Sequence, residues 1–225
     1  MKASKYVKNY TGPNPFSDSQ ARNYSDNKVS SEFYPISQFW TLFNDQHEIL
    51  LGTRGCGKTF LLKMMRYSML KKMNDPKAKK LVKEKEYIGL YVPMHLEFVA
   101  FFNDPSLSEK EQITFFEFGF NCKLAEALLT ELSSLLEDIE EVIKRAQKTA
   151  EVVEYLASVW FPGREADIYE IEELSSRIVE MYYSVENVDT DLEGIPPIFK
   201  RQICTPLLAV KTKIKQILDM PHEPT

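Results

Sequence analysis

The residues with the clearest chemical potential form a glycine-rich stretch at positions 52–59 of the 225-residue chain. Their order is Gly52, Thr53, Arg54, Gly55, Cys56, Gly57, Lys58 and Thr59, which has the spacing of a phosphate-binding loop. Glycines let the main chain turn tightly and approach a ligand closely. Main-chain N–H groups and the positive end of a following helix then attract phosphate oxygens. We call residues 52–59 the phosphate loop.

Two side chains of the phosphate loop carry most of its expected chemistry. Lys58 is the candidate catalytic residue, because an ammonium there reaches the β- and γ-phosphates and neutralises charge that develops during transfer. Thr59 is the candidate Mg²⁺ ligand through its hydroxyl. We therefore predict ATP and Mg²⁺ as cofactors. The predicted cofactor-binding residues are Gly52, Thr53, Arg54, Gly55, Cys56, Gly57, Lys58, Thr59 and Phe60.

The alternative is a glycine-rich turn that binds no ligand, and the flanking sequence disfavours it. Residues 49–51 form a short apolar run before the loop and predict a buried parallel strand. Residues 59–70 have helical spacing of apolar side chains, and residues 87–92 predict a second strand. Strand, loop, helix and strand predict the fold class: an α/β P-loop core with a parallel sheet and a large helical insertion or helical second half.

The remaining sequence predicts three regions. Residues 1–30 are expected to be an irregular arm, residues 31–105 the nucleotide-binding core, and residues 106–225 a mostly helical region. The periodicity of apolar residues predicts helices near residues 36–44, 113–139, 150–160, 167–185 and 203–218. A sheet of two strands cannot bury itself, so we expect further chain beyond Thr225 to complete it.

Hydrolysis of ATP needs an acidic residue, at the end of a neighbouring strand, that holds the Mg²⁺ shell. Glu97 is the nearest candidate, but a solvent-facing glutamate is the favoured interpretation. Glu172, Glu173 and Asp191 lie on helical or loop patterns typical of solvated faces. The sequence therefore predicts nucleotide binding, and the acid that would make the chain a phosphoric-anhydride hydrolase is not found in it.

The amino-acid composition indicates the class of protein and its expected location. Hydrophobic residues make up 44% and charged residues 27% of the chain, values that are ordinary for a globular protein. No apolar run has the length of a membrane span, and residues 1–20 contain no secretory signal. The cysteines, Cys56, Cys122 and Cys204, are odd in number and far apart, which predicts a reducing, cytoplasmic location. No metal site beyond Mg²⁺ is expected.

Residues 31–43 (SEFYPISQFWTLF), followed by residues 47–51 and the phosphate loop, support a family resemblance. This part of the chain resembles bacterial P-loop ATPases related to the origin-recognition (initiator) type of AAA ATPases and to the STAND signalling ATPases. The resemblance covers about residues 20–100. It implies that Phe33 and Tyr34 lie near the adenine. It also implies that the missing acid is contributed by further chain or by another chain.

The function predicted from these observations is an ATPase module that acts as a nucleotide-dependent switch. The resemblance implies a setting in bacterial signalling or in antiviral defence. One alternative is a phosphotransferase that acts on a small acceptor, and another is a nucleotide-binding interaction module without hydrolysis. Arg164 and Arg177 are present, but no arginine-rich lid of the kind a phosphotransferase would need is visible in the sequence.

The expected partners are a nucleotide and a protein partner or a second copy of the chain. Seven lysines at positions 71–85 form the strongest charge cluster, which is either a solvated connection or a nucleic-acid contact. Few aromatic residues interrupt this cluster, and the net charge is −5, so nucleic-acid binding is the weaker interpretation. No membrane partner is expected.

Overall fold

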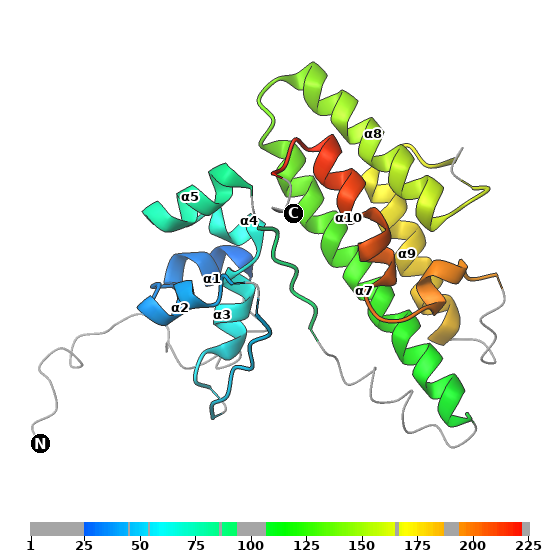
Figure 1. Ribbon diagram of the computed structural model, residues 1–225, viewed down its shortest axis with the longest axis horizontal. Helices are drawn as coiled ribbons and strands as arrows, with labels where there is room; N and C mark the ends of the chain where they lie inside the picture. Colours follow the sequence, from blue (N-terminus) through cyan, green and yellow to red (C-terminus); the bar gives the residue numbers. More distant parts are fainter. Residues whose placement is uncertain are drawn as a thin grey trace, which may run out of the picture. The chain divides into compact units, whose positions relative to one another are not determined.

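The computed structural model describes residues 25–44, 46–53, 55–85, 87–93, 107–164, 167–186 and 194–221. All regular elements within these residues are helices, and no β-strand occurs among them (Figure 1). The chain divides into two compact units, Met1–Met64 and Met65–Thr225. No helix in the described residues combines the length and the apolar character that crossing a bilayer requires.

The described residues of the first unit form the short helices α1 (Asp26–Glu32), α2 (Ser37–Thr41) and α3 (Lys58–Met64). The α2 helix confirms the helix expected near residues 36–44. Its Phe39 is fully buried and makes edge-to-face ring contacts with Phe33, Trp40 and Phe43 at centroid distances of 4.9, 4.9 and 5.2 Å. These aromatic contacts are the core of the first unit, together with the packing of α1 against α3.

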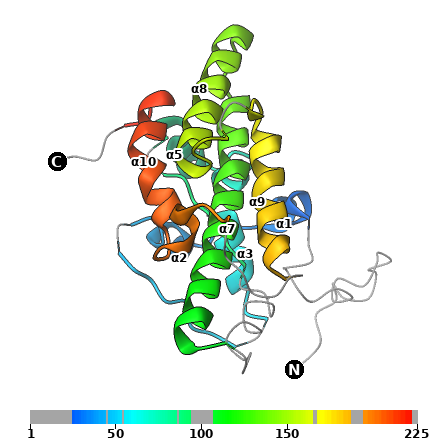
Figure 2. The same ribbon diagram turned by 90° about the vertical axis from the view of Figure 1, so that its right-hand side faces the viewer.

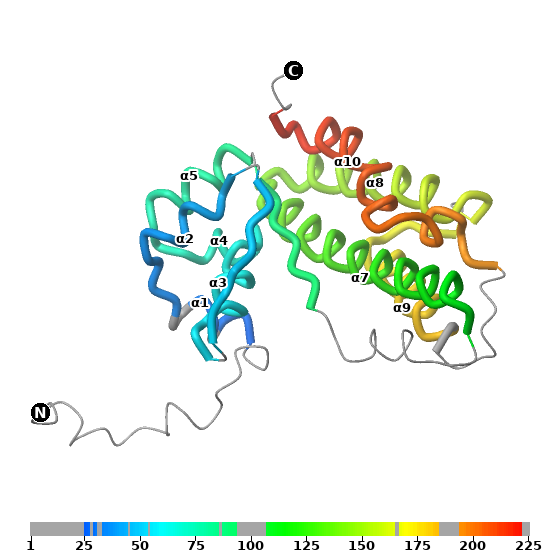
Figure 3. Tube along the Cα trace, turned by 60° about the horizontal axis from the view of Figure 1, so that its bottom comes forward, coloured from blue at the N-terminus to red at the C-terminus, as the bar shows by residue number. Residues whose placement is uncertain are grey.

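The strand expected at residues 49–51 does not form. These residues follow an extended course (Figure 3), and Ile49 and Leu51 are 82% and 88% exposed. An extended segment becomes a strand only when a neighbouring strand pairs with its N–H and C=O groups. No such neighbour exists in the described part of the chain, so this apolar run stays unpaired.

The strand expected at residues 87–92 does not form either. Residues 87–93 are extended, and Ile88 and Leu90 pack against the helical core of the second unit. Gly89 is buried so closely that a Cβ atom there would lie 2.2 Å from the Met65 carbonyl oxygen. The predicted α/β core with a parallel sheet is therefore wrong for the described residues. The apolar residues expected in the second strand pack against helices and not within a sheet.

The second unit is a helical assembly around one long helix, α7 (Glu109–Glu137) (Figures 1 and 2). Helix α7 packs against α4 (Tyr67–Leu70), α8 (Val142–Trp160), α9 (Ile171–Glu186), the 3₁₀ helix η4 (Pro197–Lys200) and α10 (Thr205–Ile217). It buries side chains on several faces, as expected of a helix surrounded by others. Helix α5 (Pro76–Glu84) packs on α4.

The four helix predictions after residue 106 are confirmed with shifted ends. Helices α7, α8, α9 and α10 cover the expected residues 113–139, 150–160, 167–185 and 203–218 in large part. Helix α7 begins earlier, because the Ser108 side chain accepts from the Glu111 amide while the Glu111 carboxylate accepts from the Ser108 amide. The fully buried Trp160 ends α8, and its indole N–H donates to the Pro206 carbonyl at 3.2 Å.

Two local expectations are corrected in the first half of the chain. Residues 59–70 do not form one helix, because α3 ends at Met64 and α4 begins at Tyr67. Residues 71–85 are not a plain connection, because they contain α5. The Asp75 carboxylate accepts from the Lys77 and Ala78 amides, and Pro76 occupies the first helical position. An aspartate followed by a proline is a helix-start signal.

Asn121 on α7 fixes the segment between η4 and α10. Its side chain is fully buried, and its amide group donates to the carbonyls of Phe199 and Arg201 at 3.1 and 2.9 Å. Its side-chain oxygen accepts from the Cys204 amide at 2.9 Å. Cys204 has a φ of 71°, so this asparagine holds a left-handed residue directly before α10.

We expect Asn121→Leu to lower the free energy of unfolding by about 2–4 kcal/mol, because it leaves buried carbonyls without a donor. Urea denaturation followed by circular dichroism measures this loss. Thr130→Ala is the control, since it removes an exposed hydroxyl from the same helix and should change stability by less than about 0.5 kcal/mol. Equal stability of the Asn121→Leu variant and the native protein would contradict the assignment.

Glu131 on α7 is buried and holds the start of α4. One carboxylate oxygen accepts from the Arg66 guanidinium at 2.7 Å and from the Ser68 hydroxyl at 3.0 Å. The other oxygen accepts from the Ser68 amide at 2.7 Å. The carboxylate thus neutralises a cation and satisfies an amide at a helix N-terminus. It anchors the chain immediately after α3.

We expect Glu131→Ala to destabilise the second unit by about 2–4 kcal/mol, because it removes the carboxylate that pairs with the partly buried Arg66 and accepts from the Ser68 amide. Glu126→Ala, on the same helix, removes a carboxylate that is 37% exposed and pairs with Lys123. This control should cost less than about 1 kcal/mol. Denaturation of both variants separates the two cases, and similar losses in both would refute the anchoring function of Glu131.

Candidate functional site

The phosphate loop folds tightly on itself. Gly55 and Gly57 have φ values of +86° and +88°, a region that side chains disfavour. The Cys56 amide donates to the Thr53 carbonyl at 3.3 Å and closes a turn. At Gly52 an added Cβ would lie 2.5 Å from the Cys56 sulfur. Glycine is therefore required at these positions by backbone conformation or by close approach.

The Lys58 ammonium lies over the phosphate loop. It donates to the Gly52 and Thr53 carbonyls at 2.7 and 2.9 Å, and its distance to the Cys56 sulfur is 3.4 Å. The structure therefore brings together four of the residues singled out in the sequence. A phosphate oxygen carries a full charge and would be a stronger acceptor for this ammonium than a neutral carbonyl.

The start of α3 adds main-chain donors to the same place. The first intrahelical hydrogen bond that follows the loop joins the Leu61 amide to the Gly57 carbonyl at 3.0 Å. The amides of Lys58, Thr59 and Phe60 precede it, so the helix itself offers them no acceptor. Amides at a helix start and a lysine ammonium are all donors, and one of them is charged. This donor set fits a polyphosphate.

A bound Mg²⁺ ion would take its ligands from the nucleotide as well as from the protein. Within the described ranges, no cluster of three or more His, Cys, Asp or Glu side chains could hold a metal ion. Thr59 would therefore provide a single hydroxyl ligand, and phosphate oxygens and water would complete the shell. Mg²⁺ is commonly bound in proteins in that way.

Other predicted site residues lie in varied surroundings. The Phe33 ring is stacked on the Phe60 ring at a centroid distance of 6.2 Å, so the segment before α2 contacts the helix that follows the loop. Tyr34 is 85% exposed. Arg54 lies outside the described residues. The contact between Phe33 and Phe60 was not predicted, since no periodic pattern joins residues so distant in sequence.

The acidic residues considered for Mg²⁺ are either outside the described residues or engaged elsewhere. Glu97 and Asp191 belong to the first group. Glu172 is an exposed residue of α9, and the Glu173 carboxylate accepts from the Tyr169 amide at 2.6 Å. Glu173 therefore serves as a hydrogen-bond acceptor at the start of α9.

Comparison with known families identifies the chain. The model of the ORC-CDC6-like family matches residues 14–223, which is most of the sequence. This match places the protein in the class of nucleotide-binding, initiator-type ATPases. The chain belongs to the ORC-CDC6-like family. Searches of curated proteins and of solved structures found no match.

The family match confirms the initiator-type part of the resemblance and extends it. The resemblance seen in the sequence covered about residues 20–100, whereas the family model also includes the helical second unit. The helices of residues 107–221 are thus part of the family pattern. They are not an unrelated addition to the loop-bearing unit.

The three cysteines differ sharply in access, which gives a direct test of the loop geometry. Cys56 is exposed, Cys204 is intermediate and Cys122 is buried. Burial raises the pKa of the Cys122 thiol far above its usual value, which suppresses the reactive thiolate. We expect a maleimide to modify Cys56 first and Cys122 at least about 100-fold more slowly. Mass spectrometry of peptides from native and urea-unfolded protein measures both rates.

In unfolded protein all three cysteines should react at similar rates, which serves as the control. Rapid modification of Cys122 under native conditions would contradict the described packing of α7. Protection of Cys56 in the protein without ligand would contradict the exposed position of the phosphate loop.

Proposed function

We propose that residues 52–59 bind ATP with Mg²⁺ and that the bound nucleotide works as a switch. The arrangement of Lys58 carries this proposal, since its ammonium lies over a loop in which Gly55 and Gly57 are left-handed and donates to the neutral carbonyls of Gly52 and Thr53. The family assignment supports nucleotide binding by the chain as a whole. Lys58 would contact the terminal phosphates, and Thr59 would contact the metal.

The switch would begin with a change of partners at Lys58. When phosphate oxygens replace the carbonyls of Gly52 and Thr53, the loop loses two hydrogen bonds that hold its ligand-free form. The loop continues directly into α3, and the chain then turns at Arg66, which Glu131 holds. A rearranged loop would therefore act on the segment that enters the second unit. The nucleotide-free and nucleotide-bound forms would differ in these contacts, as a switch requires.

The proposed reaction is hydrolysis to ADP and phosphate, with a self-associated form or a protein partner that reads the nucleotide state. Self-association accords with the family assignment. Bacterial signalling or defence, the setting that the resemblance implies, would use the same switch. A product assay separates the proposal from the other reactions, since free phosphate indicates an ATPase and a phosphorylated acceptor indicates a phosphotransferase.

We expect Lys58→Ala to weaken ATP·Mg²⁺ binding by at least about 100-fold, because two or more charge-assisted hydrogen bonds are lost. Isothermal titration calorimetry measures the affinity directly. In the native protein, saturating ATP·Mg²⁺ should also raise the thermal midpoint, since a ligand that binds only the folded state stabilises it. The variant should show no such rise.

Lys80→Ala is the matched control, because it removes an exposed lysine from α5 and should leave ATP affinity unchanged. Bound nucleotide should also slow the modification of Cys56, which lies inside the loop. If Lys58→Ala binds ATP as tightly as the native protein, or if neither protein binds it, the proposed site is refuted.

A further inference from the structure

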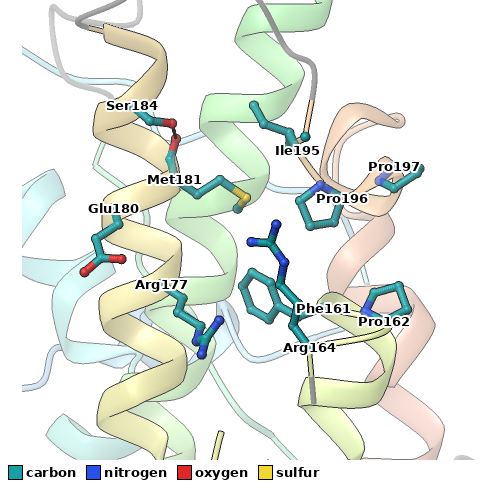
Figure 4. A pocket seen from close by; sticks show the side chains of 11 residues that line it. Phe161, Pro162, Arg164, Arg177, Glu180, Met181, Ser184, Ile195, Pro196 and Pro197 are labelled. Atoms are coloured by element: carbon teal, nitrogen blue, oxygen red, sulfur yellow. Dashed lines mark hydrogen bonds between the residues drawn. The ribbon is translucent and has the colours of Figure 1, made fainter. Parts of the chain in front are cut away.

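A cleft of about 610 Å³ opens in the second unit, far in sequence from the phosphate loop. Its walls come from α9, from the turn that follows α8, and from residues 194–196 with the first residue of η4, Pro197 (Figure 4). Its size is within the usual range for ligand sites in proteins. All of its lining residues belong to the unit Met65–Thr225.

Apolar side chains form much of the lining. Phe161 is 6% exposed and Ile195 is 7% exposed, and Met181 faces the same space from α9. Pro162, Pro196 and Pro197 make the opposite rim rigid, because proline rings fix the local backbone. A lining of this kind accommodates an apolar side chain of a ligand without requiring a large rearrangement.

Two arginines extend into this apolar space. Figure 4 shows the side chains of Arg164 and Arg177 between α9 and the proline rim, whereas Glu180 extends from α9 in the other direction. The Arg177 guanidinium donates to the Asp167 carbonyl at a long 3.4 Å. In the part of the chain that the structure describes, neither arginine forms a salt bridge. The cleft therefore has an excess of positive charge.

We propose that this cleft binds an acidic peptide segment of a partner protein, in which carboxylates flank an apolar side chain. The planar guanidinium groups of Arg164 and Arg177 match carboxylates with paired hydrogen bonds. The apolar walls accept the side chain between the carboxylates. Phe161 is too buried to stack on a nucleic-acid base, so the cleft suits a peptide better than a single strand.

The test uses the full chain and a short fluorescein-labelled peptide in which aspartates flank leucine and phenylalanine. Fluorescence anisotropy should show saturable binding that weakens as the salt concentration rises. A matched peptide with asparagine in place of aspartate should bind at least about tenfold more weakly, because it cannot pair with the guanidinium groups.

The double variant Arg164→Gln/Arg177→Gln should lose at least about tenfold in affinity for the acidic peptide. Arg201→Gln is the matched control, since it removes the same charge from an exposed arginine that does not line the cleft. Circular dichroism should show that both variants stay folded. Undiminished binding by the double variant, or equal binding of the two peptides, would overturn the proposal.

Two further measurements exclude other anions and keep this proposal separate from the proposed function. A labelled single-stranded oligonucleotide, or inorganic phosphate, that binds at these arginines while the peptide does not would also overturn the proposal. Lys58→Ala should bind the acidic peptide with native affinity, because the cleft shares no residue with the phosphate loop. Loss of ATP binding and loss of peptide binding are therefore distinguishable.

Discussion

A buried carboxylate sets the frame for the second unit. Glu131 lies in the C-terminal half of α7, buried where an unpaired charge would be costly. The Arg66 guanidinium neutralises it, and the Ser68 amide and hydroxyl donate hydrogen bonds to it. Because these partners all precede or begin α4, this one carboxylate fixes the start of α4 on the helical assembly. Asn121, nearer the start of the same helix, holds the segment that leads into α10 through hydrogen bonds to the Phe199 carbonyl and the Cys204 amide.

The loop-bearing unit follows a different principle, because its order comes from aromatic contacts and from glycine conformation. Phe39 organises three other rings, and Phe33 reaches Phe60 on the helix that follows the phosphate loop. The loop itself is held by the Lys58 ammonium, which donates to two of its carbonyls, and by the turn that the Cys56 amide closes. An anion can compete for these bonds, whereas the Asn121 and Glu131 side chains of α7 are almost fully buried. The division between a rearrangeable loop and a fixed helical unit suits a nucleotide-dependent protein.

The sequence predicted features whose cause is local. Helical periodicity located α7, α8, α9 and α10, and the glycine spacing singled out a segment that folds into a tight turn with left-handed Gly55 and Gly57. The failures were of two kinds. The strands at residues 49–51 and 87–92 depend on pairing partners that a short apolar run cannot specify. The contact of Arg66 with Glu131 joins residues far apart in the sequence, and Arg164 and Arg177 line one cleft from different elements. No sequence pattern indicates either arrangement.

The two tryptophans of the chain are divided between the two compact units. Trp40 is a half-buried member of the aromatic cluster around Phe39, and Trp160 is fully buried with its indole N–H bonded to Pro206. Each unit thus contains its own intrinsic fluorophore, and the two differ in contact with water. Replacing either tryptophan with phenylalanine would leave an emission signal that reports on one unit alone. The order in which the units unfold can therefore be followed without any attached dye.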